Sequence, residues 1–311
     1  MRGCVRGTPT SAKSTSGYYK YYFSAWTPSS NKYFYVWRDG TSPYIKVYYH
    51  NGTSWTTDTI SSNSNAGPTV VVYNSRLYIF WKNQSTQAIQ FKYYRYDGNV
   101  YGIYDLNRNG MLSSGSFDSA VFNNYLYLVY SYGGTVYLSK CTTTTCTTAG
   151  WYDFGSGVYK KSLGYSAYPG MGVDVASALN GTGAVTRLYI ASADYSYPYY
   201  RIRVDQVDTS DNKTHTSYMP TNYPSYRTYP YKEIGLKAVS SAFPSATTYL
   251  YLVWKDYYST KIYASVLQKY DDDDDSDTWF TKSVDTFLDS NTGVRFMKGD
   301  GAAVDLRDPL I

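Results

Sequence analysis

Residues 76–83 read RLYIFWKN, an apolar run closed by a lysine and an asparagine. Successive side chains of a β-strand alternate, so Leu77, Ile79 and Trp81 point to one face. Tyr78 and Phe80 point to the other, which makes both faces apolar. A strand with two apolar faces is typical of a sheet that is covered on both sides. The stretch therefore predicts a buried β-strand with a polar end.

The same pattern recurs along the chain, as KYFYVWRD at 32–39, YLYLVYSY at 125–132, RLYIASAD at 187–194 and YLYLVWKD at 249–256. Each copy follows a short β-run and precedes two more, so each unit is expected to hold four strands. The fourth segment of every unit carries an aromatic residue: Trp55, Tyr101, Trp151, Tyr218 and Trp279. Such repetition is typical of β-propeller blades, whereas a β-sandwich would not account for it.

The predicted fold is all-β, a single β-propeller of about five four-stranded blades in residues 18–311, with six blades as the alternative. The predicted units are 18–64, 65–114, 115–165, 170–222 and 232–290. Residues 1–17 are expected to form a flexible arm, and 291–311 a closing segment similar to another first strand. The 41 tyrosines and the single glutamate among 24 acidic residues favour β-structure over helix.

Composition also excludes some functions. The net charge of +5 is mild and the basic residues are scattered, so nucleic acid is not an expected partner. No apolar run approaches the ~18 residues of a membrane-spanning helix. The first residues, MRGCVRGTPTSAKSTSG, lack the apolar core of a Sec signal peptide.

Two of the three cysteines, Cys141 and Cys146, flank the run TTTT. A hairpin there would bring them opposite each other, so a disulfide of modest stabilising effect is predicted. Cys4 is left over, either free or intermolecular.

Three of the repeated strands end in an aromatic residue, a base and an acid or amide. These triplets are Trp37-Arg38-Asp39, Trp81-Lys82-Asn83 and Trp254-Lys255-Asp256. In a propeller they would share one rim. An aromatic ring covers the apolar face of a pyranose, while a donor and an acceptor satisfy its hydroxyls, so the triplets predict sugar-binding sites. The competing interpretation is that each tryptophan wedges between blades and the charges form surface pairs.

With these strands and triplets, residues 18–290 resemble the β-propeller lectins, in particular fungal and bacterial sugar-binding propellers whose blades end in a tryptophan. The resemblance implies a non-catalytic, extracellular protein that binds glycans or glycoproteins at several rim sites. Fucose-binding members use an arginine and a glutamate at each site. The single glutamate, Glu233, does not allow that chemistry to recur around the ring.

The stretch DLNRNGMLS carries Asp105, Asn107, Asn109 and Gly110 at the spacing of the first positions of a calcium loop. Integrin-like propeller lectins have loops of this kind. Calcium is therefore the one expected cofactor, with an ordinary Asn-Gly turn as the alternative.

Two other functions are compatible with the sequence. A structural or host-attachment component of a virion or surface appendage would use the arm at 1–17 to form a homo-oligomer or a larger assembly. A five-bladed glycoside hydrolase would need carboxylates around a central channel, typically two Asp and one Glu. Glu233 is expected to precede a blade rather than to lie in a strand, which disfavours the enzyme.

Overall fold

The structure is a computed structural model of the whole chain. It describes residues 22–26, 32–38, 43–50, 54–61, 63–64, 67–95, 100–106, 111, 113, 117–166, 173–179, 185–196, 199–218, 230–240, 248–256, 261–267 and 279–286. Within these ranges the chain forms strands, turns and one short 3-10 helix, Thr148–Gly150. Among them there is no helix long and apolar enough to cross a membrane. The arm at 1–17 and the segment 291–311 lie outside the described residues.

The described strands form five sheets of four antiparallel strands, and each sheet follows chain order. The first holds β1 (Tyr22–Trp26), β2 (Lys32–Arg38), β3 (Ile45–His50) and β4 (Trp55–Ser61). The second holds β5 (Thr69–Tyr73), β6 (Arg76–Lys82), β7 (Ile89–Arg95) and β8 (Val100–Asp105). The third holds β9 (Phe117–Phe122), β10 (Tyr125–Tyr132), β11 (Thr135–Cys141) and β12 (Lys161–Ser166). The fourth holds β13 (Val173–Leu179), β14 (Val185–Ser196), β15 (Tyr199–Val207) and β16 (Lys213–Tyr218). The fifth holds β17 (Pro230–Ser240), β18 (Thr248–Asp256), β19 (Lys261–Leu267) and β20 (Trp279–Thr286).

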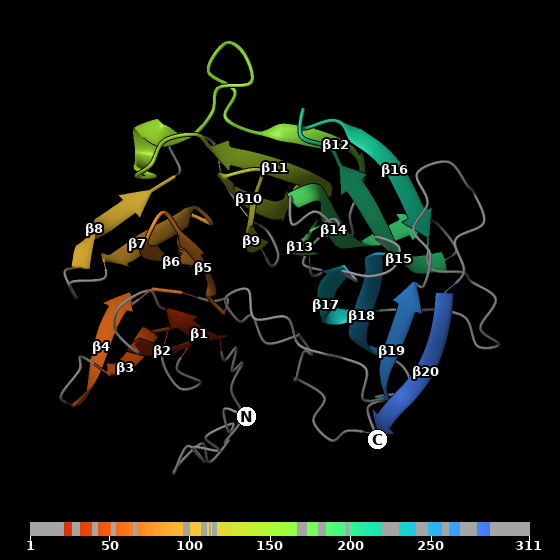
Figure 1. Cartoon of the computed structure of the whole chain (residues 1–311), viewed down its shortest axis with the longest axis horizontal. Coiled ribbons are helices and arrows are strands. Elements are labelled where there is room, and N and C mark those ends of the chain that lie inside the picture. The colour runs from red at the N-terminus through yellow and green to blue at the C-terminus, as the bar shows by residue number, and fades with distance from the viewer. Residues whose placement is uncertain are drawn as a thin grey trace.

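The five sheets stand around a common centre, with the first strand of each toward the middle and the fourth at the periphery (Figure 1). Along the ring β1 contacts β5, β5 contacts β9, β9 contacts β13, and β13 contacts β17. This arrangement confirms the predicted all-β propeller with five four-stranded blades.

Second strands hold the ring together, because both faces of β6, β10 and β14 are buried in cores. Leu77, Ile79 and Trp81 pack toward the first sheet, in a core that includes Val36 and Val47. Tyr78 and Phe80 pack on the other side of β6, in a core shared with β9, β10 and β11 of the third sheet. The predicted alternation is thus confirmed. Fully burying one such side chain contributes about 1.5–3 kcal/mol, so each of these three strands stabilises two interfaces.

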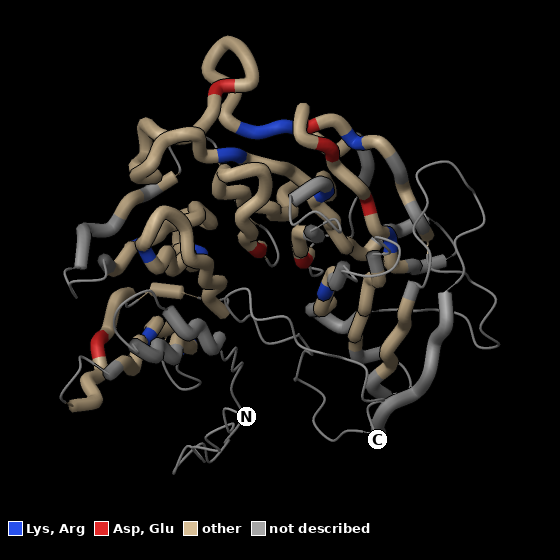
Figure 2. Tube along the Cα trace, in the orientation of Figure 1, with Lys and Arg blue, Asp and Glu red and all other residues tan. Residues whose placement is uncertain are grey.

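Polar contacts join the first strands near the centre. The Thr69 hydroxyl donates to Asp118 Oδ1 at 2.5 Å, and Asp118 Oδ2 accepts the Val175 amide at 3.1 Å. Asp174 Oδ2 accepts the Leu236 amide at 2.6 Å. Asp118 therefore links the third sheet to both the second and the fourth, and Asp174 links the fourth sheet to the fifth. Figure 2 shows the acidic segments of β9 and β13 facing the middle of the ring. Both carboxylates are buried, and hydrogen bonds of this kind offset the cost of that burial.

The third sheet departs from the predicted repeat. Its fourth strand was expected around Trp151, but β12 begins only at Lys161. Trp151 instead makes an isolated bridge with Cys141 and packs edge-on against Phe80, with ring centroids 6.3 Å apart. The connection between β11 and β12 is therefore long, and it places Trp151 in the core at a point where the sequence predicted a strand. Tyr218 also differs from its supposed equivalents, because it ends β16 whereas Trp55 begins β4.

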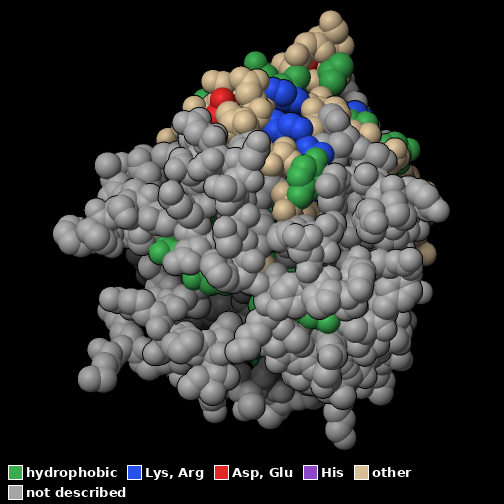
Figure 3. All heavy atoms as spheres, turned by 90° about the vertical axis from the view of Figure 1, so that its right-hand side faces the viewer, with side chains coloured by type: hydrophobic (Ala, Val, Ile, Leu, Met, Phe, Trp, Pro, Cys, Tyr) green, Lys and Arg blue, Asp and Glu red, His purple; other side chains and the backbone are tan. Residues whose placement is uncertain are grey.

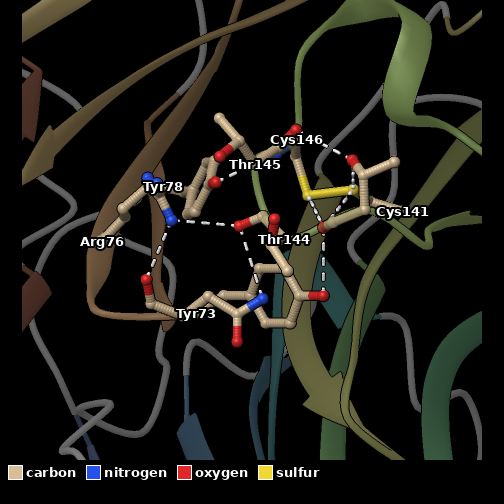
Figure 4. The surroundings of a disulfide bond; sticks show 9 residues. Tyr73, Arg76, Tyr78, Cys141, Thr144, Thr145 and Cys146 are labelled. Carbon is tan, nitrogen blue, oxygen red and sulfur yellow. Dashed lines mark hydrogen bonds between the residues drawn. A yellow bond between two sulfur atoms is a disulfide. The ribbon is translucent and has the colours of Figure 1, made fainter.

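The disulfide closes part of this same loop. Cys141 and Cys146 are joined, with their Cα atoms 5.9 Å apart, and both are fully buried. They are not opposite each other in a hairpin as expected, since Cys141 pairs with Trp151. The bond shapes a loop that docks on the second sheet (Figure 4).

Three side chains of the second sheet bind the backbone of that loop. The Tyr73 hydroxyl donates to the Thr143 carbonyl at 3.2 Å, and Arg76 donates to the Thr144 carbonyl at 3.1 Å. The Tyr78 hydroxyl accepts the Cys146 amide at 3.1 Å. The loop therefore ties the third sheet to the β5–β6 turn of the second (Figure 4).

Replacing Trp81 tests the packing of the second strands. Trp81→Ala should lower the free energy of unfolding by about 3–5 kcal/mol, because it empties a core position that is fully buried. Chemical denaturation measures the loss. Trp55→Ala is the control, because Trp55 is 42% exposed and should cost less than about 1 kcal/mol. Equal effects of the two substitutions would contradict the packing described here.

Removing the disulfide should weaken the fold without abolishing it. The double variant Cys141→Ala/Cys146→Ala should lose about 2 kcal/mol, because only a short loop is released in the unfolded chain. The comparison is made by chemical denaturation against the oxidised parent. A loss above about 5 kcal/mol would show that the loop itself, and not the covalent bond alone, had come apart.

Candidate functional site

The structure does not support an aromatic platform in two of the predicted triplets. Trp81 and Trp254 are 0% and 1% exposed, and each belongs to a core between neighbouring sheets. The Trp81 indole donates to Gln90 Oε1 at 3.0 Å, and the Trp254 ring stacks on Tyr263 with centroids 5.7 Å apart. A buried ring cannot cover a sugar, so the prediction is wrong for these two tryptophans. They are the wedges of the competing interpretation.

The polar members of the second triplet shape a turn. Asn83 Oδ1 accepts the amides of Ser85 and Thr86 at 2.9 and 3.1 Å, which orders the β6–β7 connection. Lys82 is 6% exposed, so its side chain contributes little accessible surface. These contacts give Asn83 a structural role in the turn.

The other two triplets are described only in part. Trp37 and Arg38 are half-buried, and Arg38 Nε donates to the Ser64 carbonyl at 2.9 Å. Asp39 lies outside the described residues. Lys255 and Asp256 end β18, and their side chains are not described. Sugar binding at these residues stays a prediction.

The calcium prediction likewise falls on residues that are mostly not described. Asp105 is the last residue of β8, whereas Asn107 and Asn109 lie outside the described part of the chain. The ends of this loop are joined, since the Met111 amide donates to the Leu106 carbonyl at 3.2 Å. Within the described residues no three His, Cys, Asp or Glu side chains gather as a metal site. Calcium at Asp105 remains a prediction.

Glu233 lies inside a strand, contrary to expectation. β17 spans Pro230–Ser240 and is the first strand of the fifth sheet, and its pairing with β18 is irregular between Pro230 and Ile234. Glu233 therefore belongs to the inner layer of the ring, as do Asp118 and Asp174. The sequence-based prediction placed Glu233 before the blade because the apolar pattern begins after Glu233, whereas β17 already begins at Pro230.

A cluster of polar and aromatic side chains lies between the third and fourth sheets. Tyr152 follows the 3-10 helix and is 42% exposed, and Lys140 of β11 lies over its ring, with Nζ 4.7 Å from the centroid. Lys140 forms an ion pair with Asp211, which sits in the β15–β16 turn. Asp211 also accepts the Tyr127 hydroxyl at 2.6 Å. An exposed ring thus lies beside a buried ion pair, since Lys140 and Asp211 are 9% and 5% exposed.

The β15–β16 turn is held rigidly against β12. Asp208 Oδ1 accepts the amides of Ser210 and Asn212, both at 2.9 Å, which fixes the path of the turn. Lys161 Nζ donates to the Asp211 carbonyl at 2.6 Å and to Asn212 Oδ1 at 3.1 Å. The exposed amide of Asn212 and the half-buried ammonium of Lys161 therefore lie at the edge of the same cluster.

Burial gives this cluster its electrostatic character. Desolvation raises the pKa of Tyr127 far above its ordinary value, and the hydrogen bond to the Asp211 carboxylate raises it further. Tyr127 therefore stays protonated and keeps donating to Asp211 at any physiological pH. The carboxylate is held in place by a neutral donor and a cation together.

Two further exposed tyrosines stand beside cations. Tyr132, at the end of β10, is 37% exposed and has Lys160 Nζ 6.0 Å from its ring centroid. Tyr218, at the end of β16, is 38% exposed and has the Arg203 guanidinium 5.6 Å away. Arg203 is itself paired with Asp205 at 2.8 Å. An exposed tyrosine ring beside a cation therefore recurs, although Arg203 and Asp205 are themselves buried.

Sequence reasoning missed the main cluster because Asp211 comes from a different unit than Lys140 and Tyr152. Asp211 lies about 60 residues beyond Tyr152 along the chain, and no short stretch holds all three residues. The only local signal was the turn sequence DTSDNK at 208–213, which follows a strand and is rich in polar turn formers.

Comparison with known proteins supports the fold. No protein-family model matches the chain, and no curated protein matches its sequence. The chain is similar to the six-bladed fungal lectin of Aleuria aurantia, with a TM-score of 0.50 and 13% identity over 86% of this chain and 78% of the lectin. It is also similar to the NanB sialidase of Streptococcus pneumoniae, with a TM-score of 0.56 and 10% identity. That match covers 87% of this chain and 62% of the sialidase, less than two thirds of its length.

Asp211 should be the energetic centre of the cluster. Asp211→Asn keeps the shape and tolerates the positive φ of 64° at this position, but it leaves the Lys140 ammonium without its carboxylate. The expected loss in unfolding free energy is about 3 kcal/mol. Asp208→Asn, in the same turn, removes the same charge and should cost less than about 1 kcal/mol. If both variants unfold alike in denaturant, the ion pair has no special role.

Proposed function

We propose that the protein is a carbohydrate-binding protein without catalytic activity, and that it holds sugars between the third and fourth sheets. The observation that carries the proposal is the exposed ring of Tyr152 beside the Lys140–Asp211 pair. Asn212 and Lys161 add an amide and an ammonium at the same edge.

This combination suits the chemistry of a pyranose. The ring of Tyr152 offers an apolar face to the sugar C–H groups, and its edge is supported by Phe154 in a T-shaped contact at 4.9 Å. Amide, ammonium and carbonyl groups around it provide both donors and acceptors for hydroxyls. Because the ion pair and the turn fix these groups before a ligand arrives, little ordering is required on binding.

Several weak sites would strengthen binding to multivalent glycans. The pairs Tyr132–Lys160 and Tyr218–Arg203 repeat the contact of an exposed ring with a cation on the third and fourth sheets. A glycan surface that engages more than one of them would bind about 10²-fold more tightly than one site alone. The fold similarity to a fungal lectin agrees with this proposal.

A glycoside hydrolase is the second candidate function. Asp118, Asp174 and Glu233 lie on the first strands of three successive sheets, which is the inner layer an enzyme of this architecture would use. The two aspartates, however, accept hydrogen bonds from neighbouring first strands, which gives them a structural role. An assay with aryl glycosides separates the candidates, since hydrolysis that disappears in Glu233→Gln would favour the enzyme.

We further propose an extracellular or virion-surface location, where glycans and glycoproteins are the available partners. In that setting the protein would serve recognition or host attachment, and the arm at 1–17 would join copies of the chain. Size-exclusion chromatography of the full chain and of a chain that begins at residue 18 tests the arm. Assembly that survives its removal would count against this role.

Tyr152→Ala is the direct test of the binding proposal. The variant should bind its best glycan on an array about tenfold more weakly, equivalent to about 1.4 kcal/mol, with an unchanged melting temperature. Tyr44→Ala is the matched control, because Tyr44 is an exposed tyrosine of the first sheet, at 40%, and should leave binding unchanged. Glycan binding that is insensitive to Tyr152→Ala would remove the main support for the proposed site.

A further inference from the structure

Two lysines cross between the outermost strands of the third and fourth sheets in opposite directions. Lys161, the first residue of β12, reaches to the β15–β16 turn, where it bonds to the Asp211 carbonyl and to Asn212. Lys213, the first residue of β16, reaches back and donates to the Leu163 carbonyl of β12 at 3.4 Å. We call this crossing the β12–β16 seam. It brings two ammonium groups into one narrow surface strip.

Uncharged groups position the Lys161 ammonium. An ammonium has three donors, and both acceptors of Lys161 are uncharged oxygens. The carboxylate of Asp211 is used by Lys140 and Tyr127 instead. Desolvation lowers the pKa of Lys213, the neighbouring Asp205 raises it, and Arg203 lowers it again. Lys160, on the adjoining edge of β12, also has its pKa lowered by burial. An anion would offset this partial desolvation of positive charge.

The charged surface is visible from the side of the ring that carries β16 and β20. There, lysine and arginine side chains gather within the described part of the surface, with hydrophobic side chains close by (Figure 3). The protein as a whole carries a net charge of +5, which also favours anionic partners.

We propose that the β12–β16 seam binds the anionic groups of acidic polysaccharides, with Lys161 and Lys213 as the residues that select them. The inference rests on the proposed carbohydrate binding and names the class of glycan: chains that carry sulfate esters or carboxylates. The pyranose rings lie toward Tyr152, and the charged substituent lies over the two ammonium groups. Lys140, already paired with Asp211, links the two parts of the site.

The test measures binding of the full chain to three immobilised polysaccharides at several salt concentrations. Heparin carries sulfate, hyaluronan carries carboxylate alone, and dextran is neutral. Heparin or hyaluronan should bind at least about tenfold more tightly than dextran. The double variant Lys161→Gln/Lys213→Gln should lose that preference. The slope of its log Kd against the logarithm of the salt concentration should decrease by about 1.5, by analogy with the binding of other polyanions.

Lys46→Gln/Lys92→Gln is the control, because it removes the same charge from half-buried lysines of the first and second sheets. The control should keep the preference for acidic chains. An equal loss in both double variants would overturn the proposal, because net charge would then account for binding. Binding of neutral glycans that depends on Tyr152 but not on the seam lysines would overturn it while leaving the proposed function intact. If no glycan of any class binds, the proposed function fails with it.

Discussion

The fold depends on one constraint: the second strand of every sheet is apolar on both faces. A strand of this kind cannot lie at the surface, so each sheet must pack between two neighbours, and a ring of sheets meets that demand with few exposed edges. In β6 this constraint places Trp81 against the first sheet and Phe80 in the core shared with the third. The same demand explains why Trp81 and Trp254 serve as wedges and not as binding platforms.

The repeated second strand was sufficient to predict the propeller and the number of blades, because its alternation is local and recurs with little change. The site was harder to predict. Tyr152 and Asp211 come from connections in different sheets, and each contacts Lys140. They come near each other because β12 begins late and the β15–β16 turn is bonded to Lys161 of β12. Propensity and spacing carry no information about contacts between units. For the same reason the motif could not distinguish a buried Trp81 from an exposed one.

The connection between β11 and β12 links the fold to the proposed function. The disulfide and the hydrogen bonds from Tyr73, Arg76 and Tyr78 hold the first half of this connection on the second sheet. Its second half then carries Tyr152 toward Lys140 and the fourth sheet. One loop therefore spans three sheets, and a surface for glycans arises where the repeat is broken.

Hydrogen–deuterium exchange tests the location of the site most directly. The full chain is compared with and without the glycan that binds it most tightly on an array. We predict that the ligand slows exchange in residues 140–161 and 208–213, on the facing edges of the third and fourth sheets. Protection confined to the ends of the second strands, at 37–39, 81–83 and 254–256, would contradict this account and restore the rim of the propeller as the binding surface.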